Sequence, residues 1–372
     1  MVKNKILLFG GTGTLSTAIL RKLIDLGWDI WILNRGLRKK SIPQDVNVII
    51  GDFKNPSSWI DKVSAVSFSV VIDFLSRTPE DINRIFPLFQ NKCLQYVFIS
   101  SACVYRRGRY DFPIKETSPK PNVNWSYNVE KYNSEKKLLE LATKGSAKYT
   151  IVRPYITYDD ERIPFGITPA YKYHRTIIER LKAGKPMFVW DGGDVVTTLT
   201  YVDDFANGVI GLLLNEKAYD NDFHIAGDFK YTWNEFWKIL KQELKSKSEI
   251  INVSVNDICR VMPQEKGTLM GDRALNAIFD NSKIKAAVPN LHFCCDLQTG
   301  LKHIVDYWEH DTRYLYDYKY DALLDRLMRK QSKLTHYYQY PCSKGKDRLL
   351  YSVYRYLPFR LAQKICRILK IE

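Results

Sequence analysis

The stretch Lys5-Ile6-Leu7-Leu8-Phe9-Gly10-Gly11-Thr12-Gly13-Thr14-Leu15-Ser16 predicts the fold of this chain of 372 residues. Its apolar start, residues 5–9, predicts a buried strand, and residues 14–26 predict a helix. Glycines between a strand and a helix let the backbone approach a pyrophosphate, whose charge the helix N-terminus stabilises. We therefore expect a dinucleotide site; a glycine turn without a ligand is the alternative. The expected contacts are Gly10, Thr12, Gly13, Thr14 and Leu15.

The rest of the first half alternates strand-like and helix-like segments, which is typical of a parallel sheet with crossover helices. Further strands are predicted over 29–33, 46–50, 69–74, 96–100 and 149–152, and a long helix over 127–143. We predict an α/β fold: a Rossmann-like doubly wound parallel sheet over residues 1–160, which binds NAD(P). Residues 161–310 show a looser pattern and predict a smaller C-terminal substrate lobe that alternates back into the first domain. Its predicted elements are helices over 171–182, 202–214 and 232–245 and a strand over 195–201.

The end of the second predicted strand bears on the choice of cofactor. It reads Leu33-Asn34-Arg35-Gly36, with cations at 38–40, where a dinucleotide fold usually carries an acid for the adenosine ribose. Cations suit a 2′-phosphate, so Asn34 and Arg35 favour NADP, with NAD as the alternative. A solvated basic loop would ignore the ribose. Asp52 and Phe53, after the third strand, are placed for the adenine edge, although an ordinary strand-end aspartate would also fit.

The segment Ser126-Tyr127-Asn128-Val129-Glu130-Lys131 carries the candidate chemistry. A tyrosine and a lysine four residues apart share one helix face, so the ammonium can favour the ionised phenol. Tyr132 and Lys136 have the same spacing, but each residue advances about 100°, which turns Tyr132 about 140° away from Tyr127. Ser126 or Asn124 can cap a helix that begins here, which would place Tyr127 at its start.

Several segments in order resemble the extended short-chain dehydrogenase/reductase family, which contains NAD(P)-dependent epimerases, dehydratases and ketoreductases. The resemblance covers roughly residues 3–310 and is strongest over Ser100-Ser101-Ala102-Cys103-Val104-Tyr105, which is similar to the family's Ser-Ser-Ala-x-Val-Tyr. It implies that Tyr127 exchanges a proton with a substrate oxygen, that Lys131 favours the phenolate, and that Ser101 hydrogen-bonds the same oxygen. Other matches are the glycine turn, Gly51-Asp52, 70–75, 127–131, 152–154, 202–204 and 279–283.

The resemblance also implies binding residues and a homodimer through the helices that carry Tyr127. The further cofactor contacts are Phe74, Leu75, Pro154, Tyr127 and Lys131, and the substrate contacts are Cys103, Tyr155 and Thr197.

Two departures from the family pattern narrow the reaction. Ala102-Cys103 stands where sugar 4,6-dehydratases carry an Asp-Glu pair, so we do not expect dehydration. Thr197 stands where many nucleotide-sugar epimerases carry an arginine that clamps the diphosphate, so Arg175, Lys185 or Arg273 would have to replace it. We predict an NAD(P)-dependent epimerase of a sugar or nucleotide-sugar, as in polysaccharide biosynthesis. The alternatives are an NADP-dependent ketoreductase of a keto-sugar and a non-catalytic nucleic-acid-binding or regulatory protein.

The net charge of +15 is concentrated at the C-terminus. Residues 311–372 hold 14 Lys and Arg against 6 Asp and Glu, together with ten tyrosines, and form a basic aromatic extension. The remaining body is mildly basic, so we do not expect a nucleic-acid partner. A basic amphipathic helix over 358–371 predicts peripheral membrane contact through residues 335–372. Docking of that helix on its own chain or on a second subunit is the alternative.

The cysteines and histidines predict a setting without disulfides or metal. Seven cysteines form no CxxC pair and follow no secretory leader, which indicates a reduced, cytoplasmic location, at the inner face of a membrane if the extension binds lipid. Six scattered histidines show no metal-ligand spacing, so we expect no metal.

Overall fold

The computed structural model describes residues 3–37, 42–108, 112–143, 147–329 and 345–371. The chain forms two compact units, each assembled from three separate segments. Unit 1 comprises Met1–Thr157, Thr198–Asp228 and Ala277–Cys295, and unit 2 comprises Tyr158–Thr197, Phe229–Asn276 and Asp296–Glu372. The chain returns twice to unit 1, at Thr198–Asp228 and at Ala277–Cys295, and Asp296–Glu372 is grouped with unit 2.

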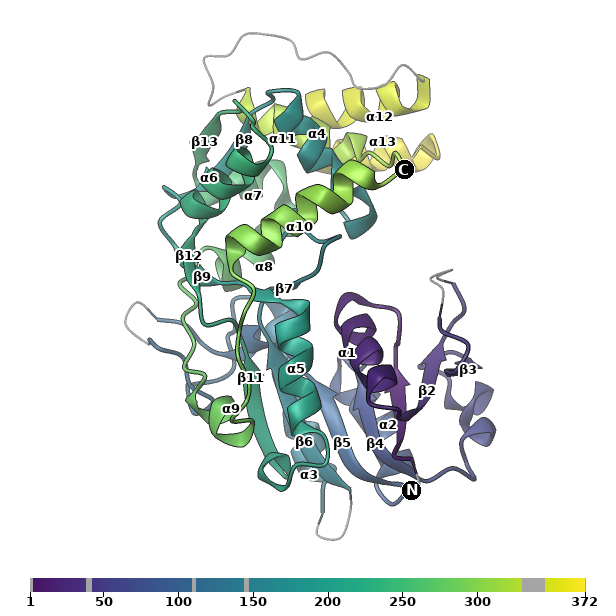
Figure 1. Cartoon of the computed structure of the whole chain (residues 1–372). Coiled ribbons are helices and arrows are strands. Elements are labelled where there is room, and N and C mark those ends of the chain that lie inside the picture. Colours follow the sequence, from purple (N-terminus) through teal and green to yellow (C-terminus); the bar gives the residue numbers. More distant parts are fainter. Residues whose placement is uncertain (1–2, 38–41, 109–111, 144–146, 330–344, 372) are drawn as a thin grey trace. The chain divides into compact units, whose positions relative to one another are not determined.

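A seven-stranded sheet in the order β11-β6-β5-β4-β1-β2-β3 forms the centre of unit 1 (Figure 1). All neighbouring strands run parallel, and the strand order changes direction between β1 and β4, which confirms the predicted doubly wound fold. The strands are β1 (Lys5–Phe9), β2 (Asp29–Asn34), β3 (Asn47–Ile50), β4 (Phe68–Asp73), β5 (Cys93–Ile99), β6 (Lys148–Pro154) and β11 (Asn221–Ile225).

Helices cover both faces of this sheet. Alternate residues of β1 separate two apolar cores, since Ile6 and Leu8 belong to the core under α1 and α5 while Leu7 and Phe9 belong to the core under α2 and α3. The helices are α1 (Thr14–Asp25), α2 (Pro79–Phe89), α3 (Ser126–Leu141), α5 (Val202–Leu212) and α9 (Ser282–Ala287). Short 3₁₀ turns are η1 (Pro56–Ser58), η2 (Ile60–Lys62), η3 (Ala102–Val104) and η5 (Glu216–Ala218).

Unit 2 is built around aromatic side chains and a two-stranded parallel ladder of β8 (Met187–Trp190) and β13 (Ile250–Val253). The Phe165 ring lies 4.6 Å from the ring centre of Trp237 and 5.0 Å from that of Trp190. The short strand β12 (Lys230–Thr232) belongs to this unit, β7 (Thr157–Tyr158) and β9 (Val196–Thr198) lie at its boundaries with unit 1, and β10 (Thr200–Tyr201) belongs to unit 1. The helices before the extension are η4 (Tyr171–Tyr173), α4 (Arg175–Lys182), α6 (Trp233–Glu243), α7 (Val255–Val261), η6 (Pro263–Glu265), α8 (Lys266–Thr268), the π-turn η7 (Leu269–Arg273) and α10 (Leu297–His310).

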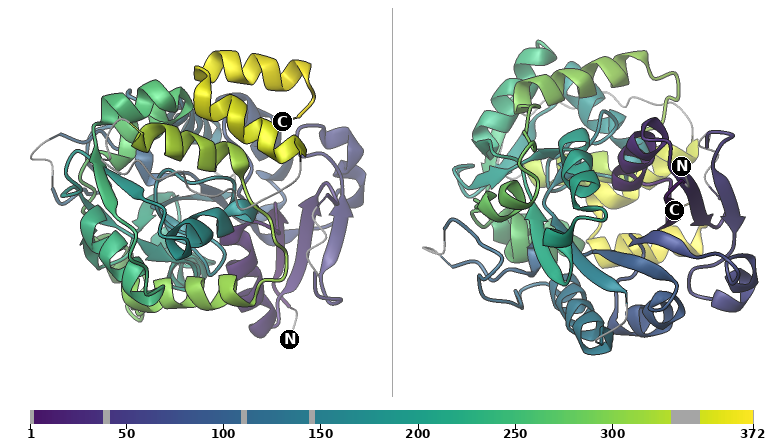
Figure 2. Two further views of the ribbon diagram at one scale, coloured as in Figure 1. Left: turned by 90° about the horizontal axis from the view of Figure 1, so that it is seen from above. Right: turned by 60° about the horizontal axis from the view of Figure 1, so that its bottom comes forward.

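The extension adds α11 (Tyr318–Met328), α12 (Gly345–Tyr356) and α13 (Phe359–Ile368). Helices α12 and α13, drawn in yellow, lie side by side in both figures (Figures 1 and 2). Residues 335–344 and 372 of the predicted membrane segment lie outside the described residues. No helix in the described part of the chain is both long enough and apolar enough to cross a bilayer.

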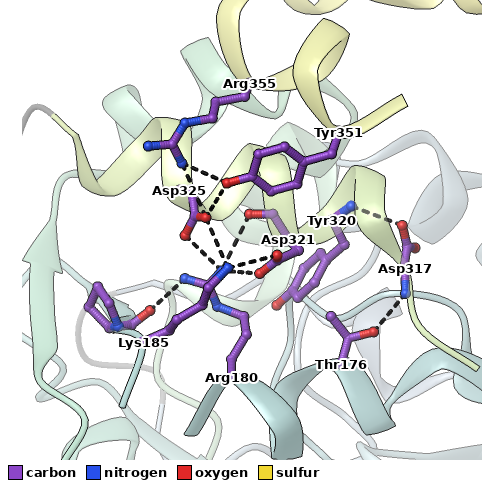
Figure 3. A network of polar contacts seen from close by, with 10 residues as sticks. Thr176, Arg180, Lys185, Asp317, Tyr320, Asp321, Asp325, Tyr351 and Arg355 are labelled. Atoms are coloured by element: carbon purple, nitrogen blue, oxygen red, sulfur yellow. Dashed lines mark hydrogen bonds and ion pairs between the residues drawn. The ribbon is translucent and has the colours of Figure 1, made fainter. Parts of the chain in front are cut away.

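A buried cluster of charges ties α11 to the rest of unit 2 (Figure 3). The Arg180 guanidinium, on α4, donates hydrogen bonds to Asp321 and, at 2.8 Å, to Asp325. The Lys185 ammonium lies 2.9 Å from the Asp321 carboxylate and 3.1 Å from that of Asp325. All four side chains are buried, so each charge depends on the others for compensation.

Helix α12 joins the same cluster. The Tyr351 hydroxyl donates to the Asp325 carboxylate, and the Arg355 guanidinium lies 3.1 Å from that carboxylate (Figure 3). The extension is therefore a structural part of unit 2 through both helices.

Candidate active site

The turn between β1 and α1 has the backbone geometry that the glycines predict. Gly10 has φ +91°, and a Cβ there would lie 2.9 Å from the Leu75 side chain. A Cβ on Gly11 would lie 2.5 Å from Ile32, so only glycine fits. Gly13 is the N-cap of α1, and a Cβ there would meet only the Ser16 hydroxyl, at 3.6 Å. The position of a Cβ on Gly13 is thus open, at a helix N-terminus, where backbone N–H groups can stabilise an anion.

Side-chain hydrogen bonds order the end of β2. The Asn34 Oδ1 accepts a 2.7 Å hydrogen bond from the Gly36 N–H, which forms a tight turn. Arg35 is exposed on this turn, where a ribose phosphate could reach it. The cations at 38–40 lie outside the described residues.

Asp52 and Phe53 differ in what they can offer an adenine. Asp52 is exposed, and its Oδ1 accepts a hydrogen bond from the Lys54 N–H at 3.0 Å. Phe53 is buried, and its ring packs 5.3 Å from that of Phe9. Its side chain is therefore part of the core, and only its backbone remains available for the predicted cofactor contact.

The loop after β4 is held by a buried carboxylate that the sequence analysis does not assign to the site. The Asp73 Oδ1 accepts hydrogen bonds from the N–H groups of Leu75 and Ser76, at 2.9 and 2.8 Å, and the Tyr96 hydroxyl donates to its Oδ2 at 2.7 Å. This fixes Leu75, which is exposed above Gly10, and the half-buried Phe74. The only signal in the sequence is a polar residue at the end of an apolar strand.

Lys131 is buried at the carboxyl ends of the strands. Its Nζ donates hydrogen bonds to the carbonyl oxygens of Ser76, at 2.7 Å, and Ile99, at 3.0 Å. Burial lowers the pKa of the amine to about 8, against the opposing charge of Asp73. Lys136, the other candidate, is exposed. The structure thus distinguishes the two lysines by burial.

Tyr127 is half-buried one helical turn before Lys131. Its ring centre lies 5.0 Å from that of Trp125 and 5.4 Å from the Arg77 guanidinium carbon. The predicted cap by Ser126 or Asn124 is wrong, because Ser126 is already helical and the N-cap residue, Trp125, makes no side-chain capping bond. Tyr127 is the second residue of α3, so it does lie at the start of the helix.

Ser101 lies directly after β5, two residues beyond the Ile99 carbonyl that binds Lys131. Its hydroxyl oxygen accepts a 3.2 Å hydrogen bond from the Cys103 N–H, and both residues are buried. A hydrogen bond from Ser101 to a substrate oxygen stays a prediction of the resemblance.

An ion pair between Arg153 and Glu135, one helical turn after Lys131, fixes α3 to the sheet. The Arg153 guanidinium, on β6, donates through Nε and Nη2 to the two carboxylate oxygens of Glu135, both at 2.8 Å. The Ser100 hydroxyl donates to the same carboxylate at 2.6 Å. Because Glu135 lies one turn after Lys131 and Ser100 precedes Ser101, this contact sets the register between the helix and the strand end.

The sequence does not predict strand β11, because its residues Asp222 and His224 are polar. The Arg153 guanidinium helps to accommodate them. Both residues fit in the sheet, since Asp222 pairs with Arg153 at 2.6 Å and His224 Nδ1 lies 3.3 Å from the Tyr105 hydroxyl. Burial lowers the pKa of His224 to about 4, so the ring is neutral near pH 7.

The three predicted substrate contacts are all buried side chains. Cys103 and Tyr155 belong to unit 1 and Thr197 to unit 2. Tyr155, next to Pro154 at the end of β6, is buried, with its ring 4.8 Å from that of Phe279.

The cations predicted as replacements for the diphosphate clamp are engaged within unit 2. Lys185 is buried in the ionic cluster, which excludes it from an exposed clamp. Arg175 lies 3.3 Å from the Glu179 carboxylate and donates to the Asp311 carbonyl oxygen at 2.6 Å. Arg273 pairs with the carboxylate of the preceding Asp272.

No metal centre is seen among these side chains. Within the described ranges, no group of three or more His, Cys, Asp or Glu could hold a metal ion.

Comparisons with known proteins identify a family for this chain. The model of the NAD dependent epimerase/dehydratase family matches residues 6–226. The chain is 27% identical over 245 residues to the chloroplast stem-loop binding protein of 41 kDa b of Arabidopsis thaliana, which covers 62% of this chain and 61% of that protein. It is 20% identical over 236 residues to the 2′-dehydrokanamycin reductase of Streptomyces kanamyceticus, covering 63% and 65%. The chain thus spans less than two thirds of both relatives.

Among solved structures, the UDP-glucose 4-epimerase of Thermus thermophilus in complex with NAD superimposes with a TM-score of 0.67. The match covers 83% of this chain and 100% of that one, at 15% identity. At this identity the likeness shows the fold alone.

Proposed function

The chain belongs to the NAD dependent epimerase/dehydratase family, and on that premise we propose that it is an NAD(P)-dependent epimerase of a sugar or nucleotide-sugar. The observation that carries the proposal is the placement of Lys131. A buried ammonium held by two carbonyl oxygens, four residues after Tyr127 on one helix, is an arrangement that favours a phenolate.

The proposed cofactor site uses residues of unit 1. The N-terminus of α1 and the space beside Gly13 would hold the pyrophosphate, and Arg35 would receive a 2′-phosphate, which favours NADP over NAD. The nicotinamide, when bound, supplies the acceptor and donor of a hydride.

The residues of the chain supply the proton chemistry. The Tyr127 phenolate accepts the hydroxyl proton of the substrate while its carbon is oxidised, and Ser101 donates a hydrogen bond to the same oxygen. The Tyr127 phenol then returns the proton when the keto carbon is reduced on its opposite face. Lys131 remains charged throughout and stabilises the phenolate. Inversion at one carbon therefore needs no net oxidant.

A reductase is the second candidate, because one relative is a 2′-dehydrokanamycin reductase. The same three side chains would then work in one direction, and the cofactor would have to exchange after each turnover. The exposed position of Arg35 suits such exchange.

RNA binding is the third candidate, because the other relative is a stem-loop binding protein. The cations of the extension could contact phosphates. The buried Lys131 argues against this as the sole function, since a lysine that binds RNA would be exposed.

The test is turnover of candidate sugar nucleotides by the full-length protein without added cofactor. Epimerisation that is lost in Tyr127→Phe, with cofactor retained, is the expected result. Strict dependence on added NADPH would establish the reductase instead. If neither activity is found after wide screening, while RNA binding persists in Tyr127→Phe and at raised salt, the enzymatic proposal is wrong.

A further inference from the structure

Helix α13 docks on unit 2 through one face and exposes an apolar edge. Ala362 and Cys366 are buried at its inner face, where the neighbouring helix is α12. Leu361, Ile368 and Leu369 are 46%, 69% and 49% exposed. Three large aliphatic side chains on one short helix are more apolar surface than a helix facing only water usually shows.

Basic side chains flank this apolar edge. At about 100° per residue, Arg360, Lys364 and Arg367 form a stripe beside the edge on the side away from the buried face, and all three are exposed. The exposed Lys370 follows the helix. Between Phe359 and Ile371 the sequence holds these four cations and no carboxylate, so the surface of α13 is strongly positive.

A hollow of about 400 Å³ lies at the end of this stripe. It is lined by Gln363, Cys366, Arg367 and Lys370. Two cations and an amide at the rim of a hollow suit a phosphate group. The leucine and isoleucine side chains of the apolar edge, on the other side of the helix from this hollow, suit acyl chains.

We propose that α13 binds the surface of an anionic phospholipid bilayer, with its apolar edge inserted among the acyl chains and its cations at the headgroups. A second copy of this face would carry the same positive charge and would be repelled. RNA would pair with the cations but would leave Leu361, Ile368 and Leu369 in water. A bilayer satisfies both sets of side chains.

The test is sedimentation of the full-length protein with vesicles of phosphatidylcholine, with and without phosphatidylglycerol. We expect binding only with the anionic lipid, and weaker binding at high salt. The variant Arg360→Gln/Lys364→Gln/Arg367→Gln should bind about 100-fold more weakly, at about fivefold per cation. Leu361→Gln/Ile368→Gln should also lose binding.

The matched control is Lys238→Gln/Lys245→Gln/Lys247→Gln, which removes three exposed charges from the same unit. It should bind vesicles like the unaltered protein, and all three variants should keep its melting temperature. Equal binding to both vesicles, an equal loss in the control, or binding of RNA alone would overturn the proposal.

Discussion

A lysine ammonium inside a protein loses its hydration, and Lys131 regains part of that energy from two carbonyl oxygens. The oxygens belong to Ser76 and Ile99, at the ends of two neighbouring strands. Asp73 holds the Ser76 loop in place through two backbone hydrogen bonds. The residue that orients the candidate catalytic lysine is therefore an aspartate that would not itself touch a substrate.

The first prediction concerns pH. Since the pKa of Lys131 is about 8, its charge is complete below that pH and is lost as the pH rises through 8. The charge favours the phenolate of Tyr127, so kcat should fall on the alkaline side with a midpoint near pH 8. A pH–rate profile at saturating substrate measures it. A flat profile up to pH 10 would contradict the assigned role of Lys131.

Single residues were predictable where the backbone decides their role. The conformation of Gly10 follows from its turn, whereas Tyr127 and Lys131 share their spacing with another pair and were selected by the family resemblance, so that their catalytic role stays a prediction. The burial of Phe53 and of Lys185 could not be predicted. Phe53 is buried by packing against Phe9, and Lys185 is buried because it pairs with carboxylates more than 130 residues away along the chain. A sequence read locally shows neither partner.

At the level of elements, the turn between β1 and α1 positions the proposed cofactor site. Two of its glycines have different structural roles. Gly11 makes room for the side chain of Ile32, while Gly13 leaves open space at the helix N-terminus. The two roles can be separated by adding one methyl group at each place.

We expect Gly13→Ala to fold normally and to bind NADP at least about tenfold more weakly, because the methyl group occupies the space of the pyrophosphate. Gly11→Ala should instead cost about 1–3 kcal/mol of unfolding free energy, because its Cβ would overlap Ile32. Fluorescence titration with NADPH and urea denaturation measure the two effects. Unchanged affinity in Gly13→Ala would argue against this site.

Elements with a clear apolar period were predictable, and β11 was not. Its residues 221–225 include an aspartate and a histidine, which hide the strand pattern. Both are satisfied by Arg153 and Tyr105, which come from other parts of unit 1. A polar strand becomes acceptable in a sheet only when such partners exist, and the sequence does not pair them.

For the whole molecule, the extension is tied to unit 2 by charges that its overall composition does not reveal. Its basic, tyrosine-rich composition predicts a separate segment, yet α11 and α12 share a buried ionic cluster with α4. Acidic residues within this basic segment perform the docking. The net charge of the extension does not show these few acidic residues. The docking of the extension on unit 2 could therefore not be predicted from its composition.

Because the charges of the cluster are buried, replacing one carboxylate by an amide should lower the free energy of unfolding strongly. Asp325→Asn would leave Arg180 and Lys185 facing Asp321 alone, and we expect a loss of about 3–5 kcal/mol in the unfolding free energy of unit 2. Asp306→Asn, exposed on α10, is the matched control and should change it by less than about 0.5 kcal/mol. Urea denaturation followed by tryptophan fluorescence, to which four tryptophans of each unit contribute, measures both.

The pH dependence of stability provides an independent test of the role of the Asp325 carboxylate. Burial alone would raise the pKa of Asp325, but Arg180 and Lys185 outweigh it and lower that pKa to about 2. A depressed pKa contributes stability above the ordinary value of 3.8 and loses it as the pH falls towards 2. The difference in stability between the unaltered protein and Asp325→Asn should therefore be constant above pH 5 and shrink below pH 4. A difference that persists at pH 2 would mean that the lost energy comes from packing rather than from the charge.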